Sequence, residues 1–238
     1  MNNFAKAIRA ALAIFFVTSV LCAAGCEKNN ENKSIGETGE SVKTEVGEET
    51  EFILTDEDKK TLLKIARVTL NEWVTNRKTP SFDIPGGLLE SDGAAFVTLR
   101  KHGRLRGCIG HLTAREPLWM CVRDMAVAAS THDSRFKPVE PDELDEIVVE
   151  VSVLTPPRKV DNYENIVLGR DGVIVRKGFK KGVFLPQVAT ETGWDLDTFL
   201  SNLCSHKAFL PSDCYRDPDV VLMNFQAIVF EEEHGRRQ

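Results

Sequence analysis

Cys108 is the strongest candidate for a chemically reactive residue in this 238-residue chain. It lies in the run Leu105–Gly110, between an arginine and two glycines. A thiolate is a nucleophile, and a nearby guanidinium favours that form. Because side chains alternate along a strand, Arg106 and Cys108 should share one face, and Leu105 and Ile109 the other. The pattern predicts an arginine-activated thiol facing outward. A small buried hydrophobe beside a bulge is the alternative.

Glu150 is the second candidate for chemistry, since it interrupts an apolar strand together with Ser152. It is either a base for Cys108 or the partner of an arginine, for which Arg135 and Arg106 are the candidates. Asp133 and Arg135 can pair with each other or cap the preceding helix. Six polar residues are expected to converge at one cleft, with Ser152 beside them: Arg106, Cys108, Asp133, Arg135, Glu150 and Gln187.

No metal site is expected from the cysteine and histidine pattern. Cys108 and His111 are three residues apart, so on a strand they face opposite sides and could bind one metal ion only if the strand broke there. His132, beside Asp133, would be the third ligand of such a site. The chain has no two close cysteine pairs of the zinc type. One disulfide between Cys204 and Cys214 is feasible, and Cys121 falls on the apolar stripe of a helix.

The charge balance is mildly acidic, with 30 Lys and Arg against 36 Asp and Glu and a net charge of −6. A nucleic-acid-binding surface requires a basic face, so this composition argues against that class of partner.

Residues 1–25 are typical of an export signal. Lys6 and Arg9 precede a short apolar stretch, and small residues then lead into Cys26. A signal that ends at a cysteine predicts a bacterial lipoprotein with lipid on Cys26, exposed on the periplasmic or extracellular side. Cleavage without lipidation, giving a soluble secreted protein, and a buried N-terminal helix are the alternatives. Residues 26–51 are polar and predict a disordered tether that reaches about 25–30 Å.

The rest of the chain predicts an α+β fold, with antiparallel strands and interspersed helices. A helix should begin at Thr55–Asp58 and another at Glu116-Pro117. Two hairpins are expected, one with its turn at residues 101–104 and the other with its turn at residues 177–178. Further elements are expected at Glu146–Leu154 (strand), Trp194–Cys204 (helix) and Val220–Phe230 (strand).

Several ordered motifs resemble the AMMECR-one domain family from about Thr55 to about Phe230. They are Leu105–Gly110, Asp133–Phe136, Glu150–Leu154 with its proline turn, Gly182–Val188 and Leu203–Ala208. In the last motif, Phe209 stands where the family has glycine. The resemblance implies antiparallel sheets in a larger and a smaller subdomain with a cavity between them. It places the domain at residues 52–232 and a tail at 233–238.

Two functions follow as expectations. The first is an exported, lipid-anchored domain that binds a small ligand or partner in a cleft around Cys108. The second is an enzyme that uses Cys108 as nucleophile with Glu150 as base, linked by the family resemblance to Memo-like and radical-SAM proteins. Iron–sulfur chemistry belongs in the reducing cytosol, which conflicts with export. The sequence indicates no particular cofactor.

Overall fold

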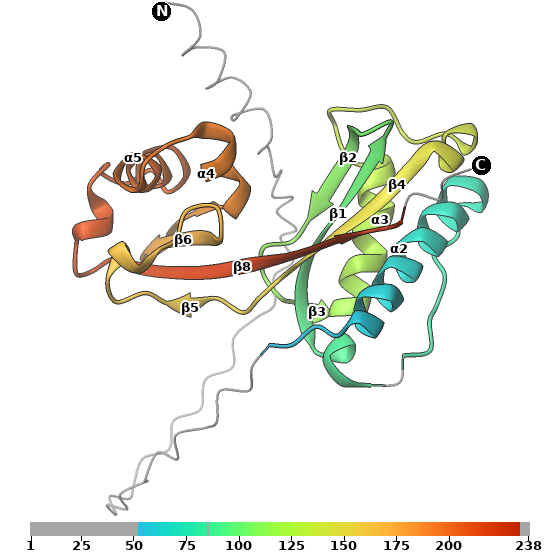
Figure 1. Cartoon of the computed structure of the whole chain (residues 1–238), viewed down its shortest axis with the longest axis horizontal. Helices are drawn as coiled ribbons and strands as arrows, with labels where there is room; N and C mark the ends of the chain where they lie inside the picture. The colour runs from blue at the N-terminus through green and yellow to red at the C-terminus, as the bar shows by residue number, and fades with distance from the viewer. Residues whose placement is uncertain (1–51, 85, 234–238) are drawn as a thin grey trace, which may run out of the picture. The chain divides into compact units, whose positions relative to one another are not determined.

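The computed structural model describes residues 52–84 and 86–233 (Figure 1). Phe52–Gln238 form one compact unit, which contains the fold described below. The predicted signal, the lipidation site Cys26 and the predicted tether lie outside the described residues.

Helix α2 (Asp56–Asn76) begins where its acidic first turn predicts. Thr55 caps it: its hydroxyl accepts a hydrogen bond from the Asp58 backbone N–H, and the Asp58 carboxylate accepts one from the Thr55 N–H. This reciprocal pair satisfies two donors that a helix start leaves free. Apolar residues at helical spacing along α2, which include Leu62, Ile65 and Leu70, are buried.

Eight strands form one antiparallel sheet. The main path runs β2-β1-β4-β8-β6-β7. Its strands are β1 (Asp92–Lys101), β2 (Arg104–Gly110), β4 (Ile147–Leu154), β6 (Asp171–Lys177), β7 (Lys180–Phe184) and β8 (Val221–Glu231). Short strands β3 (Glu116–Pro117) and β5 (Arg158–Lys159) pair with β1 and β8.

The long strand β8 joins two lobes. Residues 227–231 pair with β4, and residues 221–226 pair with β6. The larger lobe contains β1–β4 with α2 and α3 (Leu118–Thr131), and the smaller contains β5–β7 with α4 (Pro186–Thr192) and α5 (Leu196–Asn202). The α+β class is confirmed, but the strands expected in two sheets are continuous through β8. Helix α4 was not predicted.

Short helical segments complete the lobes. They are η1 (Gly87–Glu90), η2 (Pro141–Glu146), η3 (Tyr163–Asn165), η4 (Leu203–Lys207) and η5 (Cys214–Arg216). No helix in the described ranges has the length and apolar character needed to cross a membrane.

The main core lies between the helices of the larger lobe and one face of β1, β2 and β4 (Figure 1). On β4 the odd-numbered residues Ile147, Val149, Val151 and Val153 are buried on this side, as the strand period predicts. Gly107 lies so close to α3 that a Cβ atom there would sit 2.2 Å from the Ala129 carbonyl oxygen. The Leu105–Gly110 motif therefore needs a glycine for helix packing.

The feasible disulfide is present, between Cys204 and Cys214. It links η4 to η5 across ten residues of chain in the smaller lobe. Cys121 is fully buried in α3, as its place on the apolar stripe predicts.

Candidate functional site

Three polar side chains lie in a row on adjacent strands of the larger lobe. Thr98 on β1 is the register partner of both Cys108 on β2 and Glu150 on β4. Residues opposite each other in a sheet project to the same side. The Thr98 hydroxyl donates to the Cys108 sulfur at 3.3 Å. Cys108, Thr98 and Glu150 therefore form one row, on the face of the sheet away from α2 and α3.

The peptide at Cys108 is held by an ion pair from outside the sheet. One carboxylate oxygen of Asp133 accepts the Cys108 backbone N–H at 2.9 Å, and Arg135 donates to the Cys108 carbonyl oxygen at 3.2 Å. The same two side chains bind each other, with Arg135 Nη2 2.7 Å from Asp133 Oδ2. Asp133 and Arg135 thus take the place of a neighbouring strand at the β2 edge, which otherwise leaves backbone groups unpaired.

The Asp133 carboxylate is nearly inaccessible, with 4% of its side chain exposed. Burial alone would raise the pKa of Asp133, but hydrogen bonds from Arg135 and from the Cys108 N–H outweigh it, so the pKa is lowered. Asp133 is therefore ionised at neutral pH. Asp133 pairs with Arg135, which is one of the two roles that the sequence left open, and it also holds the Cys108 backbone, which the sequence did not predict.

The Cys108 thiol is not activated. Burial raises the pKa of Cys108, and the opposing effects of the Thr98 hydrogen bond and the Arg135 charge do not compensate. The sequence predicted that Arg106 or another cation would favour the thiolate. Arg106 binds Glu143 instead, and the cation near the sulfur is Arg135. At neutral pH the thiol is protonated.

Arg106 is bound to Glu143 of η2 through two hydrogen bonds, from Nε at 3.0 Å and from Nη2 at 2.7 Å. It also donates to the backbone carbonyls of Lys137 and Pro138. The Arg106 hydrogen bonds lower the pKa of Glu143 to about 2. Arg106 therefore fixes the segment before β4 to strand β2 and does not act on Cys108.

Glu150 pairs with Arg100, whose Nε lies 3.1 Å from Glu150 Oε2. The predicted partners, Arg135 and Arg106, are engaged elsewhere. Ser152 lies two residues along on the same face of β4 and is buried. Within the described chain, no hydrogen bond links the exposed Gln187 side chain on α4 to the Cys108 row.

The predicted convergence is therefore partial. The structure brings Asp133 and Arg135 to Cys108 and places Glu150 on the same face, whereas Arg106 and Gln187 belong to other contacts. Sequence reasoning missed Thr98, Arg100 and Glu143. Thr98 carried a usable signal, since it is the polar residue in the apolar run Ala94–Leu99, at the parity of Phe96. No local pattern shows which partner Arg100 or Glu143 binds.

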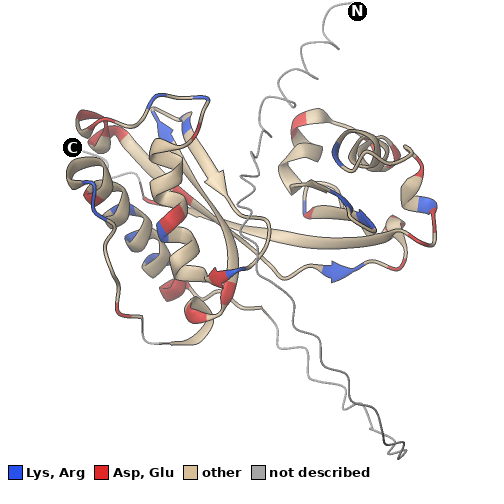
Figure 2. Ribbon diagram, turned by 180° about the vertical axis from the view of Figure 1, so that it is seen from behind, with Lys and Arg blue, Asp and Glu red and all other residues tan. Residues whose placement is uncertain are grey.

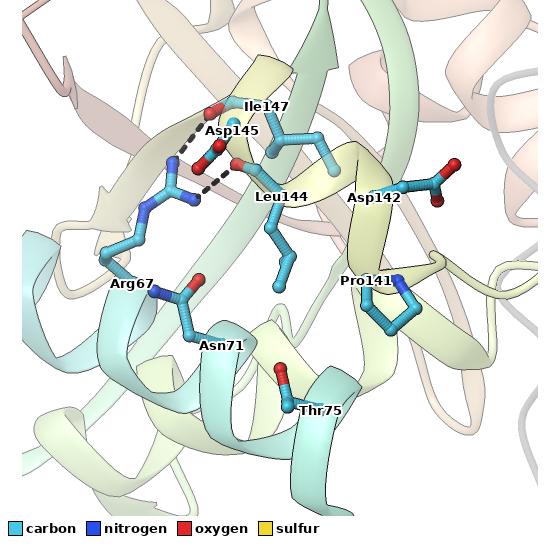
Figure 3. Close-up of a pocket in the computed structure, with 8 residues that line it drawn as sticks. All are labelled: Arg67, Asn71, Thr75, Pro141, Asp142, Leu144, Asp145 and Ile147. Carbon is cyan, nitrogen blue, oxygen red and sulfur yellow. Dashed lines mark hydrogen bonds between the residues drawn. The ribbon is translucent and has the colours of Figure 1, made fainter.

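Residues of both lobes meet beside Cys108 in a small apolar cluster. Phe96 and Ile174 are among its buried members, with Leu185 and Cys108 packed at its margin. Two surface pockets lie elsewhere. One, of about 290 Å³, is near the disulfide; the other, of about 480 Å³, is between α2 and η2 (Figure 3). In the second, Arg67 is already bound to the carbonyl oxygens of Leu144 and Ile147. No three His, Cys, Asp or Glu side chains within residues 52–84 and 86–233 gather as metal ligands would.

Comparison with known proteins agrees with this architecture. The AMMECR1 family model matches residues 63–230, which include the Cys108 row and the clamp formed by Asp133 and Arg135. The chain belongs to the AMMECR1 family. A protein of Methanothermobacter thermautotrophicus is 44% identical over 188 residues, covering 76% of this chain and 97% of the relative. A Thermococcus gammatolerans protein is 44% identical over 197 residues, covering 78% and 95%.

The crystal structure of an uncharacterised protein of Pyrococcus horikoshii has a similar fold, with a TM-score of 0.64 and 39% sequence identity. The match covers 76% of this chain and 94% of that one. The relatives are archaeal, and none of their names states a reaction. AMMECR1 membership thus gives this chain its domain and fold, and the chemistry has to be argued from the site.

Proposed function

We propose that this AMMECR1 protein is a membrane-anchored binding module that recognises a small polar ligand or a partner segment on the face of Cys108, Thr98 and Glu150. The observation that carries the proposal is the state of Cys108. Its thiol is neutral and hydrogen-bonded, and its backbone is fixed by Asp133 and Arg135. The half-buried Cys108 thiol and the Glu150 carboxylate offer a donor and an acceptor for recognition, and the buried Thr98 hydroxyl between them holds the thiol. The row lacks the activated thiolate that a cysteine nucleophile needs.

The rate of alkylation of Cys108 by iodoacetamide, measured across pH, tests this proposal. Cys108 is half-buried and Cys121 fully buried, so labelling at each is separated by peptide mass spectrometry. We expect slow labelling whose midpoint lies above the ordinary thiol value of 9.0, because burial disfavours the thiolate. Cys108→Ser should fold normally and lose the label. A midpoint below about 7 would instead favour the enzyme, with Cys108 as nucleophile and Glu150 as base.

We propose further that the domain is exported and held to a membrane by lipid on Cys26. The basic, apolar and small-residue order of residues 1–26 supports this. So does the disulfide between Cys204 and Cys214, because such bonds persist mainly in oxidising compartments. The intact mass of the mature N-terminus tests the anchor. Cys26→Ala should move the protein from the detergent phase to the aqueous phase in a Triton X-114 partition. Wild-type protein in the aqueous phase would contradict the anchor.

A partnership with a Memo-like or radical-SAM protein remains the alternative that the family resemblance suggests. It requires a cytosolic location. Recovery of the chain, with an uncleaved N-terminus, in the cytosolic fraction would favour it over the anchored binding module.

A further inference from the structure

The smaller lobe exposes two phenylalanines. Phe179, at the tip of the β6–β7 hairpin, is fully exposed, and Phe209, after η4, has 76% of its surface exposed. They are the two most exposed large apolar residues in the described part of the chain. Single exposed apolar residues are common on protein surfaces, but two aromatic rings on adjacent segments need an explanation.

The two segments are in direct contact. Lys180, the residue after Phe179, donates from Nζ to the Phe209 carbonyl oxygen at 2.8 Å. On the same strand, Gly182 lies against the backbone before Phe209: a Cβ atom at Gly182 would sit 2.8 Å from the Ala208 nitrogen. The hairpin and the segment after η4 therefore form one patch, the Phe179/Phe209 patch.

Phe209 occupies a strained backbone conformation. Its φ is +54°, in the left-handed region that favours glycine, and the family motif resembled by Leu203–Ala208 ends in glycine at this place. An exposed phenylalanine there gains no burial within the fold to offset the strain. Strain of this kind is characteristic of binding sites. This chain therefore has an exposed phenylalanine where glycine would adopt the backbone conformation more easily.

Positive charge surrounds the patch. Arg176, Lys177, Lys180 and Lys181 flank Phe179 on the two strands of the hairpin, and no acidic residue occurs from Gly172 to Thr190. Figure 2 shows these basic segments on β6 and β7 of the smaller lobe. Across from the hairpin, Asp217 pairs with Lys177. Arg176 and Lys181 have no carboxylate partner among the described residues, and Lys180 binds a carbonyl oxygen.

We propose that the Phe179/Phe209 patch docks the domain on an anionic phospholipid bilayer. Aromatic rings enter the interface between headgroups and acyl chains, and lysines beside them attract anionic lipids. The proposal draws on the anchor proposed above for proximity: a tether of about 25 residues reaches about 25–30 Å, so a domain held at Cys26 stays near the membrane.

Vesicle sedimentation of residues 52–238 tests the patch without the anchor. Phe52–Gln238 form one compact unit, and the match with the Pyrococcus structure covers 94% of that chain and 76% of this one. Vesicles of phosphatidylglycerol and phosphatidylethanolamine are compared with neutral phosphatidylcholine. We expect binding to the anionic vesicles, weakened by more than about tenfold in Phe179→Ala with Phe209→Gly and by more than about tenfold in Lys180→Glu with Lys181→Glu. Val229→Ala and Lys78→Glu, at exposed sites in the larger lobe, are the matched controls.

Phe209→Gly has a second readout. It relieves the backbone strain, so the variant should resist urea at least as well as wild type while binding vesicles less. Equal sedimentation of wild type and patch variants, or none with anionic vesicles, would overturn the proposal. Self-association that the same variants abolish, without vesicle binding, would also overturn it and assign the patch to a second copy of the chain. The anchor stands or fails separately, on the mass of the mature N-terminus.

Discussion

Removing the Asp133 carboxylate should destabilise the domain strongly, although Asp133 lies outside the core cluster. The carboxylate accepts hydrogen bonds from the Cys108 N–H, the Arg135 N–H and two guanidinium nitrogens of Arg135, at 2.7 to 3.2 Å. Asp133→Asn keeps the shape but replaces one acceptor oxygen with a donor that faces other donors. Breaking a buried ion pair by removing one partner costs about 3–5 kcal/mol. Because 28% of the Arg135 side chain is exposed and water can reach it, we expect about 2–4 kcal/mol.

Urea unfolding of residues 52–238 at several pH values measures this effect. The folded-state pKa of Asp133 is lowered, so the unfolded chain binds its proton first as pH falls. The contribution is therefore complete above the ordinary value of 3.8 and is lost as pH falls through the folded pKa. The stability gap between wild type and Asp133→Asn should be full at pH 7 and shrink in acid.

Asp161→Asn is the matched control, because that side chain is 88% exposed and should change stability by less than about 0.5 kcal/mol. If Asp133→Asn also lowers the free energy of unfolding by less than about 0.5 kcal/mol at pH 7, or by an amount independent of pH, the Asp133–Arg135 clamp does not support the Cys108 strand. Loss of the clamp also frees backbone groups on the β2 edge. Self-association of Asp133→Asn, detected by light scattering, is the expected companion effect.

Three further changes test the packing around the site and in the smaller lobe. Glu143→Gln should cost about 2 kcal/mol at pH 7 by urea unfolding, and, with a folded pKa of about 2, the cost should vanish as pH falls from 4.5 toward 2. Gly107→Ala should cost about 2–3 kcal/mol through its clash with α3, whereas Gly178→Ala, at φ +59° in open space, should cost about 1 kcal/mol. Replacing Cys204 and Cys214 together by alanine should cost about 2.5–3 kcal/mol, the entropy of the ten-residue loop.

Each of these has an outcome that would contradict it. A pH-independent loss for Glu143→Gln would mean that its charge is not what stabilises η2. Equal losses for the two glycine variants would point to backbone strain, and not to the helix contact. No change in stability on treating wild type with dithiothreitol, while the double alanine variant is unstable, would mean that packing and not the bond matters.

Local patterns predicted most of the larger lobe because the periods of helix and strand are visible in the sequence. The buried stripe of α2, the cap at Thr55 and the alternation on β4 each depend on residues two to four positions apart in the chain. The turn at His102 and Gly103, with φ of 51° and 74°, is the type that a two-residue hairpin requires. Helix α4 was not predicted because it spans only seven residues, beginning at Pro186, and has no full apolar stripe.

The site was predicted in part for the same reason. Strand parity correctly put Cys108 on the face away from Ile109, since side-chain direction is a local property. The partner of each charge was decided by tertiary structure, because ion pairs form between whichever groups the fold brings within about 4 Å. Arg106 therefore pairs with Glu143, 37 residues along the chain, and Arg135 takes the place beside the sulfur. The sequence alone determined which residues could do chemistry here. Burial, which depends on both lobes and on β8, decided that the Cys108 thiol stays protonated.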